Sequence, residues 1–148
     1  MRHMSMVAVS GGFDPLHEGH IRMFKAARRM GSILIVILNR DEFLVKKKGR
    51  AYQNYAERKA AILEVPAVDY VVQCIDKDMT VCKTLESIHP NTFANGGDRK
   101  AVGDLPEADI CDKLGINMVF NVGGGKIESS SRLNKLQDTE ERVLKCVK

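Results

Sequence analysis

Two histidines three residues apart follow a pair of glycines near the start of the chain. The run reads Gly11-Gly12-Phe13-Asp14-Pro15-Leu16-His17-Glu18-Gly19-His20. Glycine lets the backbone approach a ligand closely, and the first turn of a helix offers N–H groups and the positive end of its dipole to a phosphate. His17 and His20 at such a turn would share one side, with Gly19 leaving the space between them open. Because imidazole N–H groups donate hydrogen bonds to phosphate oxygens, the loop is a candidate phosphate site. A lone His-x-x-His run, however, is more often a glycine turn with two solvent-exposed histidines.

A second candidate group is a run of cations that follows an apolar stretch at residues 33–38: Lys46, Lys47, Lys48 and Arg50. Cation runs most often form a solvated surface patch. A run that follows a strand of a parallel sheet, however, lies at the same edge as the histidine loop. We therefore expect at least one of these lysines to contact a phosphate. Lys46 is the first choice, with the other two lysines left open.

Two glycine-rich stretches in the last third of the chain form a third group. They are Gly96-Gly97-Asp98 and Gly123-Gly124-Gly125-Lys126, the latter followed by Glu128, Ser129, Ser130 and Ser131. Alone, a Gly-Gly-Asp run most often makes a turn, and a serine run most often caps a helix. Their chemistry therefore depends on where the surrounding elements place them.

The elements alternate regularly between strand and helix patterns. An apolar run at 6–10, a helical pattern at 19–30 and the unbroken apolar run at 33–38 predict a β-α-β unit with strands buried on both faces. The pattern then predicts a loop at 46–50, helices at 55–64, 78–88 and 107–114, strands at 70–73, 92–94 and 118–122, a loop at 95–106, and a last helix or helix pair from 129. This alternation predicts an α/β fold: a Rossmann-like open parallel sheet of about five strands with helices on both faces. Such sheets bind ligands beyond the carboxyl ends of their strands.

Length and composition exclude several classes of protein. A chain of 148 residues with 44% hydrophobic and 28% charged residues is typical of one globular domain. A net charge of +4, no tryptophan and 5% aromatic residues give little support to a nucleic-acid-binding domain. The four cysteines lack zinc-site spacing, so we expect reduced thiols and no protein-bound metal. No apolar run is long enough for a membrane span and no signal-peptide pattern is present, so we expect a cytoplasmic protein.

The spacing Gly-x-Phe-Asp-x-x-His-x-Gly-His resembles the signature of the nucleotidyltransferase superfamily of the cytidylyltransferase type. The resemblance extends over residues 6–136, the expected nucleotidyltransferase domain, and leaves 137–148 as a C-terminal helical extension. It implies phosphate binding by Arg58, which lies in a stretch similar to glycerol-3-phosphate cytidylyltransferases. It also implies nucleotide contacts by Gly97 and Asp98, as in heptose-phosphate adenylyltransferases, and triphosphate binding by Ser129, Ser130 and Ser131. Glu128 departs from the small or apolar residue that the family has there.

The resemblance implies transfer of a nucleoside monophosphate from ATP or CTP to a sugar- or polyol-phosphate, with release of pyrophosphate. The implied catalytic residues are His17, His20, Lys46 and Arg58. The implied nucleotide-binding residues are Gly11, Gly12, Phe13, Asp14, Gly19, Gly97, Asp98, Ser129, Ser130 and Ser131. Magnesium would arrive with the nucleotide, and a homodimer is expected because many relatives pair. Two alternatives stay open: adenylyl transfer to a cofactor precursor of the FAD or pantetheine type, and a non-catalytic nucleotide sensor.

Overall fold

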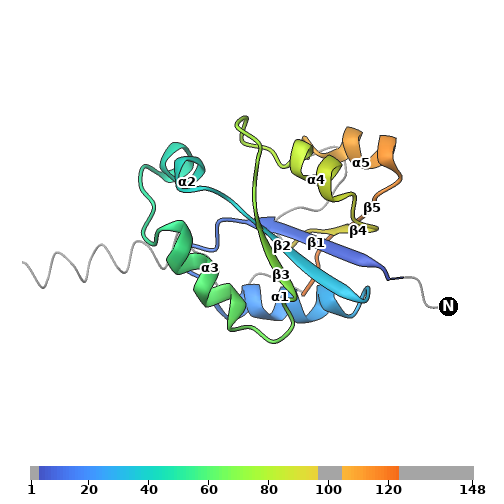
Figure 1. The fold of residues 1–148 in the computed structure, drawn as a ribbon, viewed down its shortest axis with the longest axis horizontal. Helices are drawn as coiled ribbons and strands as arrows, with labels where there is room; N and C mark the ends of the chain where they lie inside the picture. Colours follow the sequence, from blue (N-terminus) through green and yellow to red (C-terminus); the bar gives the residue numbers. More distant parts are fainter. Residues whose placement is uncertain (1–3, 97–104, 124–148) are drawn as a thin grey trace, which may run out of the picture.

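The computed structural model describes residues 4–96 and 105–123, which form a sheet of five parallel strands. The strands are β1 (Met6–Gly11), β2 (Ile33–Leu38), β3 (Tyr70–Gln73), β4 (Thr92–Ala94) and β5 (Asn117–Val119). Their order across the sheet is β3-β2-β1-β4-β5 (Figure 1). The predicted open parallel sheet is therefore confirmed. The strand order reverses between β1 and β4, the place where sheets of this kind bind ligands.

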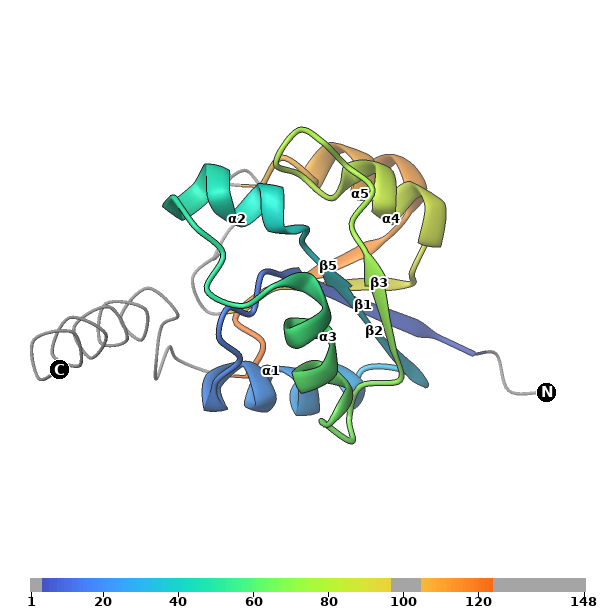
Figure 2. The same ribbon diagram turned by 60° about the vertical axis from the view of Figure 1, so that its left-hand side comes forward.

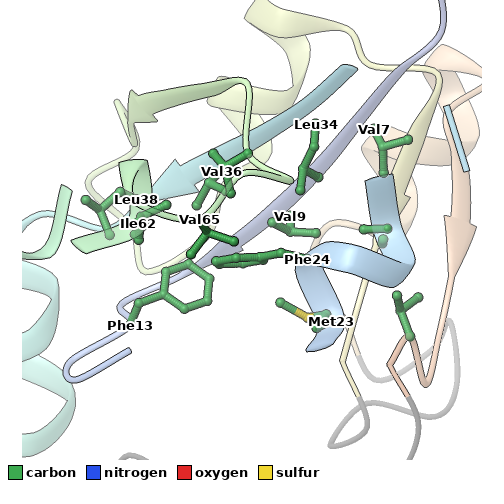
Figure 3. Packing of buried hydrophobic residues seen from close by; sticks show 14 residues of the cluster. Val7, Val9, Phe13, Met23, Phe24, Leu34, Val36, Leu38, Ile62 and Val65 are labelled. Carbon is green, nitrogen blue, oxygen red and sulfur yellow. The ribbon is translucent and has the colours of Figure 1, made fainter. Parts of the chain in front are cut away.

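The central strands are buried on both faces, as the unbroken apolar run of β2 predicts. Every residue of β2 after Ile33 is buried. On one face, Val7 and Val9 of β1 pack in a cluster with Phe24 (Figure 3). On the other face, Ala8 belongs to a second cluster that contains Phe93. The two clusters hold the sheet between two helical layers.

Five helices accompany the sheet in the described part of the chain. They are α1 (Glu18–Arg28), α2 (Asp41–Lys48), α3 (Tyr55–Leu63), α4 (Cys82–Ile88) and α5 (Ala108–Leu114). Helices α1 and α3 cover one face and α4 and α5 the other, which confirms the prediction of helices on both faces (Figures 1 and 2). Helix α2 lies beyond the carboxyl end of β2 rather than over a face (Figure 1).

Several predicted boundaries were wrong. The helix predicted at 19–30 ends at Arg28, and the strand predicted at 118–122 ends at Val119. The loop predicted at 46–50 is helical as far as Lys48, and Gly49, at φ 89°, ends α2 in the left-handed conformation. Acidic residues in the first turn of α2 and lysines in its last turn complement the helix dipole, which favours this helix despite its charge. Helix α4 begins at Cys82 instead of residue 78, because the Asp76 carboxylate accepts the backbone N–H groups of Lys83 and Thr84. The final helix predicted from 129 lies outside the described residues.

Candidate active site

The two histidines lie at the N-terminus of α1, in the loop that leaves the carboxyl end of β1. His17 is the cap residue: its Nδ1 accepts a hydrogen bond from the Gly19 backbone N–H at 3.1 Å. The backbone N–H of His17 in turn donates to Nδ1 of His20 at 3.2 Å. The two rings stack with centroids 3.7 Å apart and planes 23° apart. The histidines therefore share one side of the first turn, as predicted.

These hydrogen bonds decide which ring nitrogen carries the proton. Because both Nδ1 atoms accept backbone N–H groups, a neutral His17 or His20 carries its proton on Nε2. Burial, and secondly the charge of His17, lower the pKa of His20 to about 3. His20 is therefore neutral at physiological pH and presents an Nε2–H donor without a positive charge.

Small residues and one strained backbone conformation give the loop its shape. A Cβ on Gly19 would lie 2.9 Å from Cε1 of His17, so a larger residue there would displace the stacked His17 ring. Phe13 has φ 49°, in the left-handed region that non-glycine residues rarely adopt. Its buried ring meets the His20 ring edge-on, with centroids 4.8 Å apart. Phe13 therefore covers His20 rather than facing solvent.

Asp14 is an anchor of the loop. Its carboxylate is 1% exposed and accepts the backbone N–H groups of Tyr52 at 2.8 Å and Gln53 at 2.7 Å. Lys48 Nζ lies 3.2 Å from the same carboxylate and donates to the Asp14 carbonyl oxygen at 2.8 Å. The arrangement ties the histidine loop to the turn that precedes α3.

Arg58 lies fully inside the protein, with 0% of its surface exposed. Its Nη1 donates to the carbonyl oxygens of Gly12 at 2.9 Å and Asn39 at 2.7 Å. Its Nη2 pairs with the Asp41 carboxylate at 2.6 Å, and its Nε donates to the Gln53 carbonyl at 3.0 Å. The guanidinium thus joins the carboxyl ends of β1 and β2 to the starts of α2 and α3.

Two cations, one in the last turn of α2 and one just after that helix, lie over the Tyr52 ring beside this loop. Arg50 places its guanidinium carbon 4.0 Å from the centre of the Tyr52 ring, and Lys48 Nζ lies 5.2 Å from it. Lys46 and Lys47 are exposed in the last turn of α2. Since Asp14 holds the backbone of Tyr52 and contacts Lys48, this positive surface is fixed to the histidine loop.

Asn39 and Asp41, which the sequence analysis did not select, also belong to this site. Asn39 follows β2 and is 5% exposed, and its Oδ1 is buried without a hydrogen-bond partner among the described residues. Polar residues directly after an unbroken apolar strand were the signal that could have found both. Other predicted nucleotide contacts lie outside the described residues: Gly97, Asp98, Ser129, Ser130 and Ser131, together with Glu128.

A doubly wound parallel sheet with a glycine-containing loop and a stacked histidine pair at a helix N-terminus defines a Rossmann-like α/β domain, a class in which such helix N-termini commonly bind phosphate groups. The comparison with protein families agrees with that class and identifies one family within it. The cytidylyltransferase-like family model matches residues 8–118, and the chain belongs to that family.

Proteins similar to this chain include two kinds of curated relative and a solved structure. The bifunctional protein HldE of Streptomyces coelicolor is 36% identical over 115 residues, which cover 76% of this chain but 24% of that relative. The glycerol-3-phosphate cytidylyltransferase of Bacillus subtilis is 38% identical over 69 residues, 47% of this chain and 54% of that enzyme. The crystal structure of a lipopolysaccharide core biosynthesis protein from Thermoplasma volcanium matches with TM-score 0.67 and 30% identity. That match covers 80% of this chain and 94% of the other.

None of the helices formed by residues 4–96 and 105–123 combines the length and the apolar character needed to cross a membrane.

Proposed function

We propose that this protein is a nucleotidyltransferase that joins a nucleoside monophosphate to a small phosphorylated acceptor. The observation that carries the proposal is the stacked pair of His17 and His20 at the N-terminus of α1, at the carboxyl end of β1. Family membership and the similarity to a cytidylyltransferase support the same reaction. Phosphoryl and nucleotidyl transfer need alignment and charge stabilisation more than covalent help from the protein, and this site supplies both.

The proposed reaction is a direct in-line transfer. An oxygen of the acceptor phosphate forms a bond to the α-phosphorus of the nucleoside triphosphate. The bond between that phosphorus and the oxygen that bridges the α- and β-phosphates breaks. Pyrophosphate leaves with the electron pair of that bond. The Nε2–H groups of His17 and His20 donate to the phosphate oxygens as charge builds on them, and Lys46 stabilises the same charge from α2. Magnesium belongs to the substrate, carried by the triphosphate oxygens.

The acceptor we propose is a sugar- or polyol-phosphate, such as heptose 1-phosphate or glycerol 3-phosphate. The similarity to a lipopolysaccharide core biosynthesis protein and to a glycerol-3-phosphate cytidylyltransferase supports this class. Because the sequence resembles both heptose-phosphate adenylyltransferases and glycerol-3-phosphate cytidylyltransferases, ATP and CTP are both candidate donors. We also propose a cytoplasmic homodimer that supplies a precursor for lipopolysaccharide or lipid synthesis.

The test is pyrophosphate release with magnesium, crossing ATP and CTP against sugar, polyol and cofactor-precursor phosphates. Turnover with one sugar- or polyol-phosphate pair is the expected result. Triphosphate binding without turnover across the panel would favour a sensor and contradict the proposed transfer. Turnover only with a pantetheine or flavin phosphate would contradict the proposed acceptor class.

The role of His17 is tested by His17→Ala. Loss of one donor to a developing phosphate charge typically lowers kcat by about 100- to 1,000-fold. Glu18→Gln is the matched control, because Glu18 is the exposed neighbour in the same turn and pairs with Arg22 at 3.5 Å. Activity of His17→Ala within a few-fold of the control would remove His17 from the transition state.

A further inference from the structure

We propose that Arg58 is a positioning residue: held away from the substrate, it sets the place of His20 through the Gly12–Phe13 peptide. This replaces the direct phosphate contact that the family resemblance implies for Arg58. Only the kinetic part of the proposal rests on the proposed function. The structural part concerns the protein without substrate.

The burial of Arg58 argues against direct contact with a ligand. No part of the side chain is exposed, and its donors point to the carbonyl oxygens of Gly12, Asn39 and Gln53. The charge is matched by Asp41 Oδ1, 2.6 Å from Nη2. Exposing this guanidinium to a substrate phosphate would break bonds whose acceptors are backbone groups of three different segments. A buried charge that loses its partners is costly, so the arrangement is held in place.

The Gly12 carbonyl connects Arg58 to the histidines. That oxygen belongs to the peptide that joins Gly12 to Phe13. Because a peptide is planar, the hydrogen bond from the guanidinium holds the orientation of this whole peptide and of the Phe13 backbone that follows it. Phe13 holds φ 49°, a conformation that persists only where neighbouring contacts impose it. Fixing this peptide thus fixes where the Phe13 side chain can point.

The Phe13 ring passes this constraint to His20. It lies between two rings of α1, edge-on to His20 with centroids 4.8 Å apart and to Phe24 with centroids 5.1 Å apart. Figure 3 shows Phe13 beside Phe24 at the margin of the core. A shift of the Gly12–Phe13 peptide would move this ring and uncover one side of His20.

Asp14 closes the arrangement from the other direction. Arg58 Nε donates to the Gln53 carbonyl, while the Asp14 carboxylate accepts the Gln53 N–H at 2.7 Å. The histidine loop and the turn before α3 are therefore bound to each other by two buried ionic side chains of opposite sign. If either side chain broke its hydrogen bonds, buried backbone groups would be left without partners.

The environment of His20 gives the proposal a readout that is independent of activity. His17 is the titratable group stacked on His20, and burial is the larger cause of the low pKa of His20. If Arg58 keeps Phe13 over His20, weakening Arg58 admits water to the imidazole and raises this pKa toward its usual value of 6.5. A purely structural role elsewhere in the fold would leave the titration of His20 unchanged.

The experiment compares Arg58→Lys with Arg28→Lys. Lysine keeps the positive charge but cannot donate to Gly12, Asn39 and Asp41 together in the planar geometry of arginine. Arg28 is a matched control, since its Nη1 also donates to a backbone carbonyl, that of Gly31 at 2.9 Å, far from the histidine loop. Imidazole NMR titration of the folded, substrate-free proteins measures His20 directly.

For Arg58→Lys we expect the pKa of His20 to rise by about one unit or more. We also expect kcat to fall by about 100-fold through misalignment, with KM for the triphosphate within a few-fold. Arg28→Lys should leave both unchanged. A folded Arg58→Lys protein with the wild-type His20 titration would overturn the proposal, and a large rise in KM at constant kcat would assign Arg58 to the substrate instead.

The proposal stays testable if Arg58→Lys does not fold or if the wild-type protein has no transferase activity. If Arg58→Lys does not fold, Asp41→Asn keeps the arginine but removes the anion that holds its Nη2, which loosens the guanidinium and should raise the pKa of His20 in the same direction. An unchanged titration in Asp41→Asn would then overturn the proposal. If the wild-type protein shows no nucleotidyl transfer, the proposed function fails, while the His20 titrations still decide the role of Arg58.

Discussion

At the scale of single residues, the histidine loop shows how neighbours change what a side chain can do. An exposed histidine near neutral pH is partly charged. His20 instead carries one proton on Nε2, because Nδ1 accepts a backbone N–H and Phe13 covers the ring. The residue type predicts a side chain that binds phosphate, and the contacts make His20 a neutral hydrogen-bond donor. Neutral donors stabilise developing charge without holding the ground-state anion as tightly as a cation would.

The low pKa of His20 predicts an acid-sensitive fold. Its folded pKa of about 3 is below the usual value of 6.5, so the unfolded chain binds a proton in this range that the folded protein does not. The free energy of unfolding contributed by His20 is therefore fully present above pH 6.5 and is lost as pH falls toward 3. We expect His20→Gln to flatten the pH dependence by up to about 1.4 kcal/mol per pH unit. Urea unfolding of both proteins at several pH values below neutrality measures this, and parallel curves would contradict it.

At the scale of elements, caps and glycines place the helices more than helix propensity does. Helix α3 begins after Asn54, whose Oδ1 accepts the Glu57 N–H at 2.9 Å, while the Glu57 carboxylate accepts the Asn54 N–H at 3.2 Å. This capping box fixes where α3 starts, and with it the position from which Arg58 reaches the Gly12 carbonyl. Local sequence signals thus set the starting point of a long-range contact.

Gly123 illustrates a packing requirement between elements. Both Gly115 and Gly123 have positive φ, but a Cβ on Gly115 would meet nothing within 4 Å. On Gly123 it would lie 2.8 Å from the Cα of Met23 in α1. We expect Gly115→Ala to lower the free energy of unfolding by about 1 kcal/mol for backbone strain alone. Gly123→Ala should cost about 1–3 kcal/mol more, because the backbone of α1 would have to move.

Chemical denaturation of the two alanine variants beside the wild-type protein measures this difference. Equal losses of stability in Gly115→Ala and Gly123→Ala would show that the segment at Gly123 does not pack on α1 as closely as described.

At the scale of the whole molecule, the exposed apolar residues bear on assembly. Tyr70 on the edge strand β3 is 59% exposed, Ile75 after it 55%, and Val45 on α2 50%. The described strand β3 is hydrogen-bonded to β2 along one side only. Edge strands with exposed apolar side chains readily pair with another chain.

We expect a homodimer, and we expect this edge to contribute to it. Sedimentation should give twice the mass of the 16.5 kDa chain, and Tyr70→Lys should shift the equilibrium toward monomer by placing a charge on the edge. Lys113→Gln is the control, because this exposed lysine lies on α5, which packs on β5 at the opposite edge of the sheet. A wild-type mass of 16.5 kDa at working concentration would contradict the dimer. A dimer insensitive to Tyr70→Lys would place the interface elsewhere.

The sequence by itself determined the β-α alternation, the parallel sheet and the placing of both histidines at the start of the first helix. These features depend on residues close in the chain: the apolar run of β2, the glycines at Gly11 and Gly12, and a histidine at a helix cap. Local periodicity and turn chemistry are sufficient for them.

Only the tertiary structure decided that Arg58 is buried, that Asp14 anchors a distant turn and that His20 is neutral. Arg58 meets Gly12 across 46 positions of sequence, and Asp14 meets Gln53 across 39. No local pattern encodes such pairs, because they form only when the strands align and bring the carboxyl ends of β1 and β2 together. An arginine can bind a phosphate or donate hydrogen bonds to backbone carbonyl groups. Burial of the side chain distinguishes these two roles, and the sequence alone does not reveal that burial.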